Sequence, residues 1–183
     1  MNNKIKINPI VLLILLFVSC VSKPEAAGTF AQPLPLDVSA VRYDERNHSN
    51  EIALAVLEVL RGADAEQFAA ESLDAESLPP LADGAEYLAV KVIFDIKHAP
   101  ASDTLPLYPH WHVVLREENA GEDIAIVNWR DMAMEAVPPY SAETWLFFIV
   151  HKDSQPLLYF QPYRIYSSEE FRNSGAYFSL NAP

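Results

Sequence analysis

Hydrophobic and polar residues alternate most clearly between Tyr87 and Lys97. The apolar positions on one side of this segment fall two residues apart, at Leu88, Val90, Val92, Phe94 and Ile96. A period of two places alternate side chains on one face of an extended chain. The segment therefore predicts a β-strand with one buried face.

Other short apolar segments predict further strands. Ile52–Leu60 is apolar on both faces and fits either a buried strand or a short helix, but its β-branched residues and the Arg61-Gly62 pair that follows favour a strand. We expect Leu157–Phe160 to pair back after a turn at Lys152–Pro156. The remaining expected strands are Val38–Tyr43, Trp111–Leu115, Ile124–Trp129, Trp145–Val150 and Tyr177–Leu180.

One helix interrupts this series of strands. Asp64–Leu73 combines a residue that can cap a helix, Asp64, with a modest apolar stripe at Phe68 and Leu73. Short strands separated by regular turns are typical of sandwiches. The pattern predicts an all-β fold, an immunoglobulin-like antiparallel β-sandwich with one short helix, over residues 37–183.

The N-terminal segment has the pattern of a secretory signal. Lys4 and Lys6 precede the short apolar stretch Ile10–Val18, and the small Ser19 follows it. The junction Phe17–Cys20 resembles a bacterial lipobox, in which the cysteine is acylated and becomes the first mature residue. We therefore expect a lipoprotein signal peptide at 1–19 and lipidation at Cys20. A secreted protein without lipid and an uncleaved anchor are the alternatives.

Residues 20–36 are rich in proline, alanine and small side chains, and they predict a flexible tether between the lipid and the domain. Together these features predict an extracytoplasmic protein that is lipid-anchored to a bacterial membrane. Cys20 is the only cysteine, so no disulfide can form within one mature chain.

Two stretches carry a family resemblance. The first runs from Val59-Leu60-Arg61-Gly62 through the predicted helix to Gly84–Val92, and the second runs from Glu143–Val150 to Pro156-Leu157-Leu158. In order and spacing they resemble a bacterial lipoprotein domain family of unknown function whose members carry a telokin-like immunoglobulin sandwich. The resemblance covers roughly Glu51–Pro162. It implies an interaction module facing the envelope, and it brings no catalytic residues.

The charge of the chain narrows the choice of partners. The formal net charge is −12. Removal of residues 1–19 takes away Lys4 and Lys6 but no acid, so the mature chain reaches −14. Such a surface repels phosphate backbones and anionic lipid, so we expect no nucleic acid partner and membrane attachment only through the lipid on Cys20. A basic envelope protein or a cationic ligand suits this charge.

The candidates for metal or catalytic chemistry are few. His110 and His112 would share one face of a strand and approach one metal ion, but a third ligand such as His98 is not evident. The acidic pairs Glu117-Glu118 and Glu122-Asp123 lack the alternating spacing of a calcium loop and suggest a solvated hairpin tip. We therefore expect no metal site, no cofactor and no enzymatic activity. An envelope-acting enzyme or metal-dependent accessory protein is the alternative, and a purely structural envelope protein is a third.

Aromatic residues near turns are the candidate partner contacts. Tyr140, Tyr163 and Tyr166 lie beside prolines or turns, where rigid side chains bind at little cost in conformational entropy. Trp129 and Trp145 are better explained by packing within or beside the core. The sequence thus predicts a lipid-anchored immunoglobulin-like module that binds through its loops.

Overall fold

The computed structural model describes residues 28–44, 50–74, 77–98, 105–117, 122–130, 132, 135–161 and 175–181. The predicted signal peptide, Cys20, Tyr163 and Tyr166 lie outside these residues.

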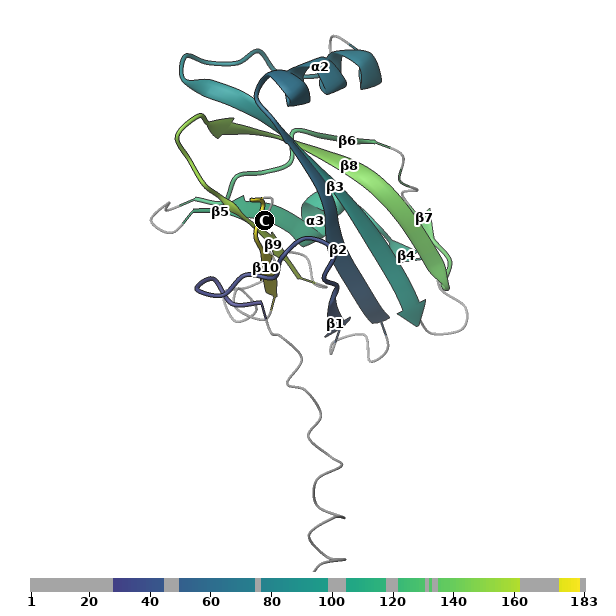
Figure 1. Cartoon of the computed structure of the whole chain (residues 1–183). Helices are drawn as coiled ribbons and strands as arrows, with labels where there is room; N and C mark the ends of the chain where they lie inside the picture. The colour runs from purple at the N-terminus through teal and green to yellow at the C-terminus, as the bar shows by residue number, and fades with distance from the viewer. Residues whose placement is uncertain are drawn as a thin grey trace, which may run out of the picture.

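Two antiparallel sheets form the body of the described chain (Figure 1). The larger sheet has the strand order β1 (Ala40–Asp44), β2 (Asn50–Arg61), β3 (Ala85–His98), β8 (Tyr140–His151) and β6 (Asn128–Arg130). The smaller sheet has the order β10 (Ala176–Phe178), β9 (Leu157–Phe160) and β5 (Val113–Arg116). A short ladder of β4 (Leu105–Pro106) and β7 (Glu135–Ala136) lies beside them. The all-β sandwich predicted from the sequence is confirmed.

The strand order is that of an immunoglobulin domain. Constant-type domains place strands A-B-E-D in one sheet and C-F-G in the other. If β2 is strand A, then β3, β5, β6, β8, β9 and β10 follow as strands B to G. The observed orders β2-β3-β8-β6 and β5-β9-β10 then reproduce both sheets. Among the described residues, the additions to this plan are β1 beside strand A, the helix between strands A and B, the short ladder of β4 and β7, and a short helix before strand C.

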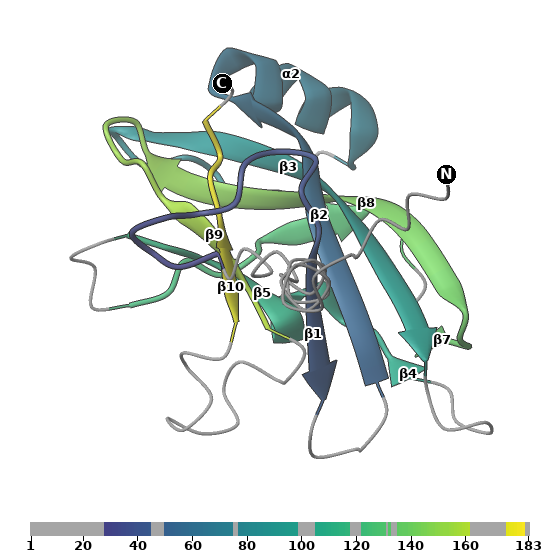
Figure 2. The same ribbon diagram turned by 60° about the horizontal axis from the view of Figure 1, so that its bottom comes forward.

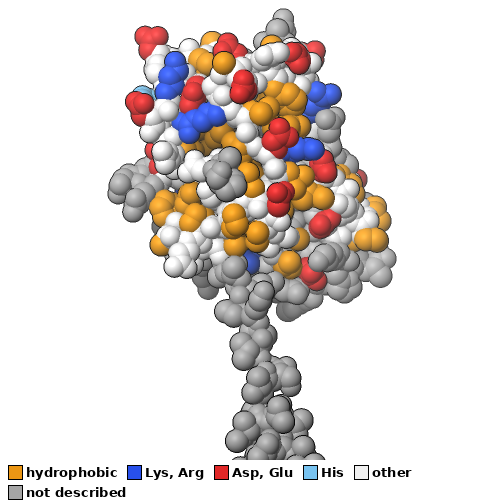
Figure 3. Space-filling model, in the orientation of Figure 1, with side chains coloured by type: hydrophobic (Ala, Val, Ile, Leu, Met, Phe, Trp, Pro, Cys, Tyr) orange, Lys and Arg blue, Asp and Glu red, His pale blue; other side chains and the backbone are white. Residues whose placement is uncertain are grey.

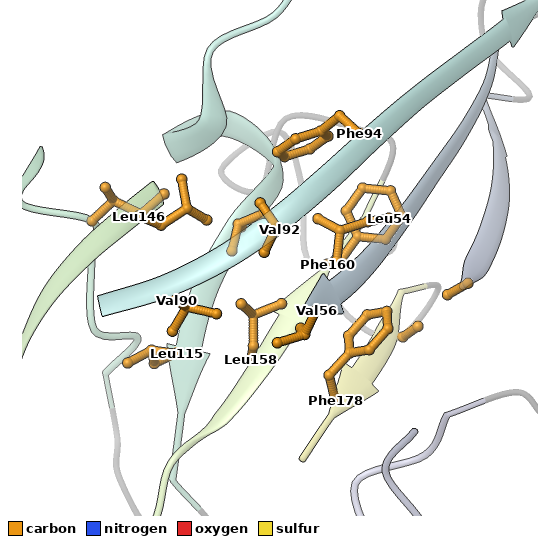
Figure 4. Close-up of a cluster of buried hydrophobic side chains, with 14 of the residues drawn as sticks. Leu54, Val56, Val90, Val92, Phe94, Leu115, Leu146, Leu158, Phe160 and Phe178 are labelled. Atoms are coloured by element: carbon orange, nitrogen blue, oxygen red, sulfur yellow. The ribbon is translucent and has the colours of Figure 1, made fainter. Parts of the chain in front are cut away.

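The main hydrophobic core lies between the two sheets. Phe94 of β3 and Phe160 of β9 are fully buried and meet edge to face, with ring centroids 6.3 Å apart. Figure 4 shows side chains from both sheets converging in this layer, among them Leu54, Val56, Val90, Val92, Leu115, Leu146, Leu158 and Phe178. The alternation of β3 therefore sets which of its faces is buried here, as the sequence predicts.

Helix α2 (Ala63–Ser72) covers the outer face of the larger sheet (Figure 1). Its small residues Ala65 and Ala69 are buried against the sheet, and the ring of Phe68 lies 4.5 Å from that of Trp145 on β8. The predicted helix is confirmed, but its predicted cap is wrong. The cap residue is Gly62, which makes no side-chain cap bond, and Asp64 lies within the first turn.

The segment Trp111–Leu115 is not the single strand that the sequence predicts. A short helix, α3 (Pro109–His112), comes first, and β5 begins only at Val113. Pro109 stands at the start of α3, where its fixed backbone angle favours a helical turn. Val113, Val114 and Leu115 are then all buried, because β5 is covered on both faces.

Two other strand predictions are wrong in part. Of the predicted strand Ile124–Trp129, only the end belongs to β6, while Ile124 forms an isolated bridge to Leu115. Leu157–Phe160 does not pair back on the preceding strand. It crosses to the other sheet and pairs with β5 and β10.

The segment before β1 is packed on the sandwich rather than free. Leu34 is 3% exposed, its amide donates to the carbonyl of Tyr177 (2.8 Å), and its carbonyl accepts from the amide of Ser179 (2.8 Å). Figure 2 shows this purple segment passing beside β10 on its way to β1. The predicted tether at 20–36 is therefore too long, because the docked chain already includes Gly28, whose carbonyl accepts from the amide of Tyr177.

Candidate functional site

The structure describes one of the three candidate tyrosines. Tyr140 begins β8, is half-buried and packs against the main core. Part of its ring therefore has a packing role, and a partner would meet only the remainder. Tyr163 and Tyr166 are outside the described residues, so their role stays a prediction.

The two candidate histidines lie on a helical turn, not on a strand. His112 is buried, and its Nδ1 lies 3.2 Å from the carbonyl oxygen of Gln161. The ring of His110 instead lies against that of Trp129, with centroids 5.3 Å apart. Because residues two apart on a helix point in different directions, the shared face expected for a metal pair is not formed. The side chain of His98 lies outside the described residues.

The acidic tip between β5 and β6 is tied to a polar network. Asp123 accepts two hydrogen bonds from the guanidinium of Arg116, at 2.7 and 3.1 Å. That guanidinium lies 3.7 Å above the buried ring of Tyr159 and donates to the hydroxyl of Tyr177. Burial disfavours the charge of Arg116, but these hydrogen bonds outweigh burial and raise its pKa. The ion pair between Arg116 and Asp123 stabilises the smaller sheet, and the carboxylate of Asp123 is held by Arg116.

Burial also raises the pKa of Tyr159, and the nearby positive charge of Arg116 opposes that rise. The hydroxyl of Tyr159 donates to Oε1 of Gln161 at 3.0 Å and accepts from the amide of Gly175 at 3.1 Å. Gly175 has no room for a side chain, because a Cβ there would collide with the Phe160 carbonyl and the Tyr159 ring. This network is therefore structural.

A pocket of about 440 Å³ lies at the edge of the sandwich where β2 approaches the last described residues of the chain. Leu36, Val59 and Leu180 line it and also pack against the main core. Figure 3 shows the face that carries β2 in Figure 1, with hydrophobic side chains exposed among acidic and basic ones. The six apolar residues of the lining are Leu36, Leu57, Val59, Leu88, Pro156 and Leu180. The pocket is thus an opening into the apolar layer between the sheets.

The polar part of this lining is Glu58, Arg61, Gln155 and Asn181. Arg61 forms an ion pair with Glu86 through its Nε. Its Nη2 donates to three carbonyls where β8 ends and turns toward β9, at 3.1, 3.1 and 2.8 Å: those of His151, Lys152 and Ser154. Arg61 thereby holds this turn at the mouth of the pocket.

An irregularity in β2 shapes the pocket wall. The register with β3 passes from Val56 opposite Val92 to Glu58 opposite Lys91, so Leu57 is an extra residue. Such a bulge bends the strand and increases its twist. Beyond it, Val59 packs toward the core between the sheets, while Leu60 packs toward α2. No sequence pattern marks this bulge, which is why sequence reasoning missed the pocket.

Comparison with models of known families, with curated proteins and with solved structures finds no match to this chain. Within the described residues, no helix has the length and hydrophobicity that a membrane span requires. In the same part of the chain, no three histidine, cysteine or acidic side chains gather as metal ligands would. Because no match is found and Cys20 lies outside the described residues, the family resemblance and the lipidation of Cys20 stay predictions.

Proposed function

We propose that this protein is a lipid-anchored, extracytoplasmic immunoglobulin-like module of a bacterial envelope, and that it binds an envelope protein or a cationic ligand without catalysing a reaction. The observation that supports this proposal best is the pocket between β2 and the C-terminal residues. It combines an apolar lining with a polar rim, as binding sites commonly do.

The proposed anchor is the acylated Cys20. Gly28 is already hydrogen-bonded to the domain, so seven residues, 21–27, separate the lipid from the folded part, and eight Cα–Cα steps lead from Cys20 to Gly28. At about 3.3–3.6 Å per extended residue, that linker spans no more than about 29 Å. The domain would therefore stay close to the bilayer surface, and its partner would be another protein or ligand in that layer.

The charge of the chain supports a basic partner. The mature chain would carry a net charge of −14. Within the pocket lining, the acid Glu58 is exposed, whereas the base Arg61 is paired with Glu86. A field of one sign favours association with partners of the opposite charge.

The chemistry of the pocket favours binding over catalysis. The one cation in its lining, Arg61, already contacts Glu86 and three backbone carbonyls. Its guanidinium therefore stabilises the connection between β8 and β9 and is not directed at a substrate. Glu58 is exposed to solvent. A general acid or base needs a positioned group whose pKa suits proton transfer, and these two side chains do not form such an arrangement.

Two measurements on the full chain test the proposal. Mass spectrometry of chain extracted from envelopes should find acyl mass on an N-terminal peptide that begins at Cys20, and an unmodified Cys20 in a wholly soluble chain would refute the anchor. Chemical cross-linking in native membranes should capture a specific partner, and high salt should reduce the capture because screening weakens contacts between exposed charges. Turnover of an envelope substrate by the purified chain would refute the binding function.

A further inference from the structure

The outer edge of β2 is covered along only part of its length. β1 pairs with β2 from Asp44 opposite Asn50 to Ala40 opposite Leu54, and the amide of Asp37 then donates to the carbonyl of Val56 (2.8 Å). From Leu57 onward, β2 pairs with β3 alone among the residues that the structure describes. The bulge thus marks the point at which the strand edge becomes open.

The direction of the backbone groups on this edge follows from one hydrogen bond. The amide of Gly62, directly after β2, donates to the carbonyl of Tyr87 on the β3 side. Backbone groups of an antiparallel strand alternate between its two neighbours. Leu60 therefore faces β3 with its amide and carbonyl, while Val59 and Arg61 present theirs to the open side.

An open edge of this kind is a template for another strand. In strand addition, hydrogen bonds of the main chain supply affinity, and pockets that receive alternate side chains supply specificity. Here the apolar pocket lies directly beside the open edge and includes Leu57 and Val59 of that edge in its lining. An added strand would place every second side chain against this pocket.

Charge decides which strand can be added. A second copy of this chain would bring a second net charge of −14 and a second exposed Glu58 to the same edge, so self-pairing is disfavoured. A basic strand would meet the exposed Glu58, which lies on this edge opposite Lys91 of β3. The occupant that fits is therefore an extended, basic segment of a different protein.

We propose that the outer edge of β2 from Leu57 to Arg61 binds an extended segment of a partner protein, in which apolar side chains alternate with lysine or arginine. The segment adds as a strand to the larger sheet and places its apolar side chains in the pocket. This inference rests on the proposed binding function and names the class of partner and the surface that it meets.

Three synthetic peptides of about eight residues, a usual strand length, provide the probes. One alternates valine with lysine, one alternates valine with glutamate, and one has alternate residues of the first replaced by proline. Binding to the full chain in mild detergent is measured by fluorescence anisotropy. The valine–lysine peptide should bind at least about tenfold more tightly than either of the others, because only it offers both a strand backbone and positive charge.

Val59→Pro is the decisive variant. It removes the outward amide of Val59 but no bond to β3, and proline is tolerated where a strand amide faces away from its ladder. Binding of the valine–lysine peptide should weaken by about tenfold or more, while the melting temperature stays close to that of the wild type. Val59→Ala, which keeps the amide but shortens the side chain that lines the pocket, is the matched control and should weaken binding clearly less than Val59→Pro does.

Glu58→Lys keeps the proposal testable if Val59→Pro does not fold. This exchange preserves the backbone and should reverse the preference between the lysine and glutamate peptides. Hydrogen exchange resolved by residue gives an independent readout: the peptide should slow exchange at Val59 and Arg61, whereas Leu60 should already be protected in the free chain.

Binding that is equal for all three peptides, or that Val59→Pro leaves intact, overturns the inference. So does a dimer of the full chain that Val59→Pro dissociates, because the edge would then belong to a second copy. If a partner is captured in membranes through another surface, the strand-addition inference fails and the proposed binding function stands. If no partner is captured at all, the proposed function itself fails.

Discussion

Phe94→Ala tests whether the layer between the sheets holds the fold together. Phe94 is fully buried on β3, and its ring meets that of Phe160 on the opposite sheet at 6.3 Å. An aromatic side chain buries roughly 150–250 Å², which at about 25 cal/mol per Å² corresponds to about 4–6 kcal/mol. Alanine keeps the Cβ but leaves a cavity, so we expect a loss of about 3–5 kcal/mol in the free energy of unfolding.

Urea denaturation of wild type and variant, followed by intrinsic fluorescence, measures this loss. Ile93→Ala is the matched control, because Ile93 is the next residue on β3 and is half-exposed on the other face. Its cost should be clearly smaller, about 1 kcal/mol. Equal costs for the two variants would refute the reasoning, since they would mean that the two faces of β3 are equally buried.

Three further predictions follow from named contacts. Arg61→Ala should lower the free energy of unfolding by about 1–2 kcal/mol, because three turn carbonyls and Glu86 lose a charged donor; thermal melts check this, and an unchanged melting temperature would contradict it. The raised pKa of Tyr159 means that its unfolded form ionises first as the pH rises above about 10. Stability should therefore fall above that pH and fall less steeply in Tyr159→Phe, whereas parallel curves would count against a buried hydroxyl. Calorimetry should find no stoichiometric zinc binding, because His110 and His112 do not share a face; sub-micromolar binding that is lost in His112→Ala would reverse this.

The parts of the fold that depend on local pattern could be predicted from the sequence. The alternation from Leu88 to Ile96 identified β3 and the face that it buries between the sheets, and the apolar stripe of Phe68 and Leu73 identified α2. These elements were predictable because a period of two or of 3.6 residues is a property of neighbours along the chain. The prediction at Trp111–Leu115 was wrong because Pro109 sets a helical turn there, which the alternation of apolar residues did not reveal.

The candidate site could not be predicted, because it depends on contacts between distant residues. The pocket joins Leu36, Val59 and Leu180, which lie far apart in the sequence. The open edge exists because β1 pairs only as far as Leu54 and because Leu57 is inserted opposite β3. Register and bulges of this kind follow from the packing of the whole sandwich, so a single sequence carries little signal for them.

The same reason explains the misplaced start of the domain. Residues 28–36 have the composition of a linker, but Leu34 is buried and bonds to the chain around β10. The bridge between Leu34 and Phe178 brings the first described residues beside the last ones. It covers the outer edge of β10, which would otherwise be an open edge of the smaller sheet. A composition rich in proline and alanine does not exclude such docking.

Photo-cross-linking at the mouth of the pocket tests the central claim most directly. A photoreactive phenylalanine analogue replaces Gln155, which is exposed on the pocket rim, or Glu122, which is exposed on the tip between β5 and β6, in the full chain in native membranes. We predict a specific adduct from position 155 alone, which maps to an alternating apolar and basic segment of another protein and is lost when Val59→Pro is added. The same adduct from both positions, or an adduct that persists with Val59→Pro, would contradict the account.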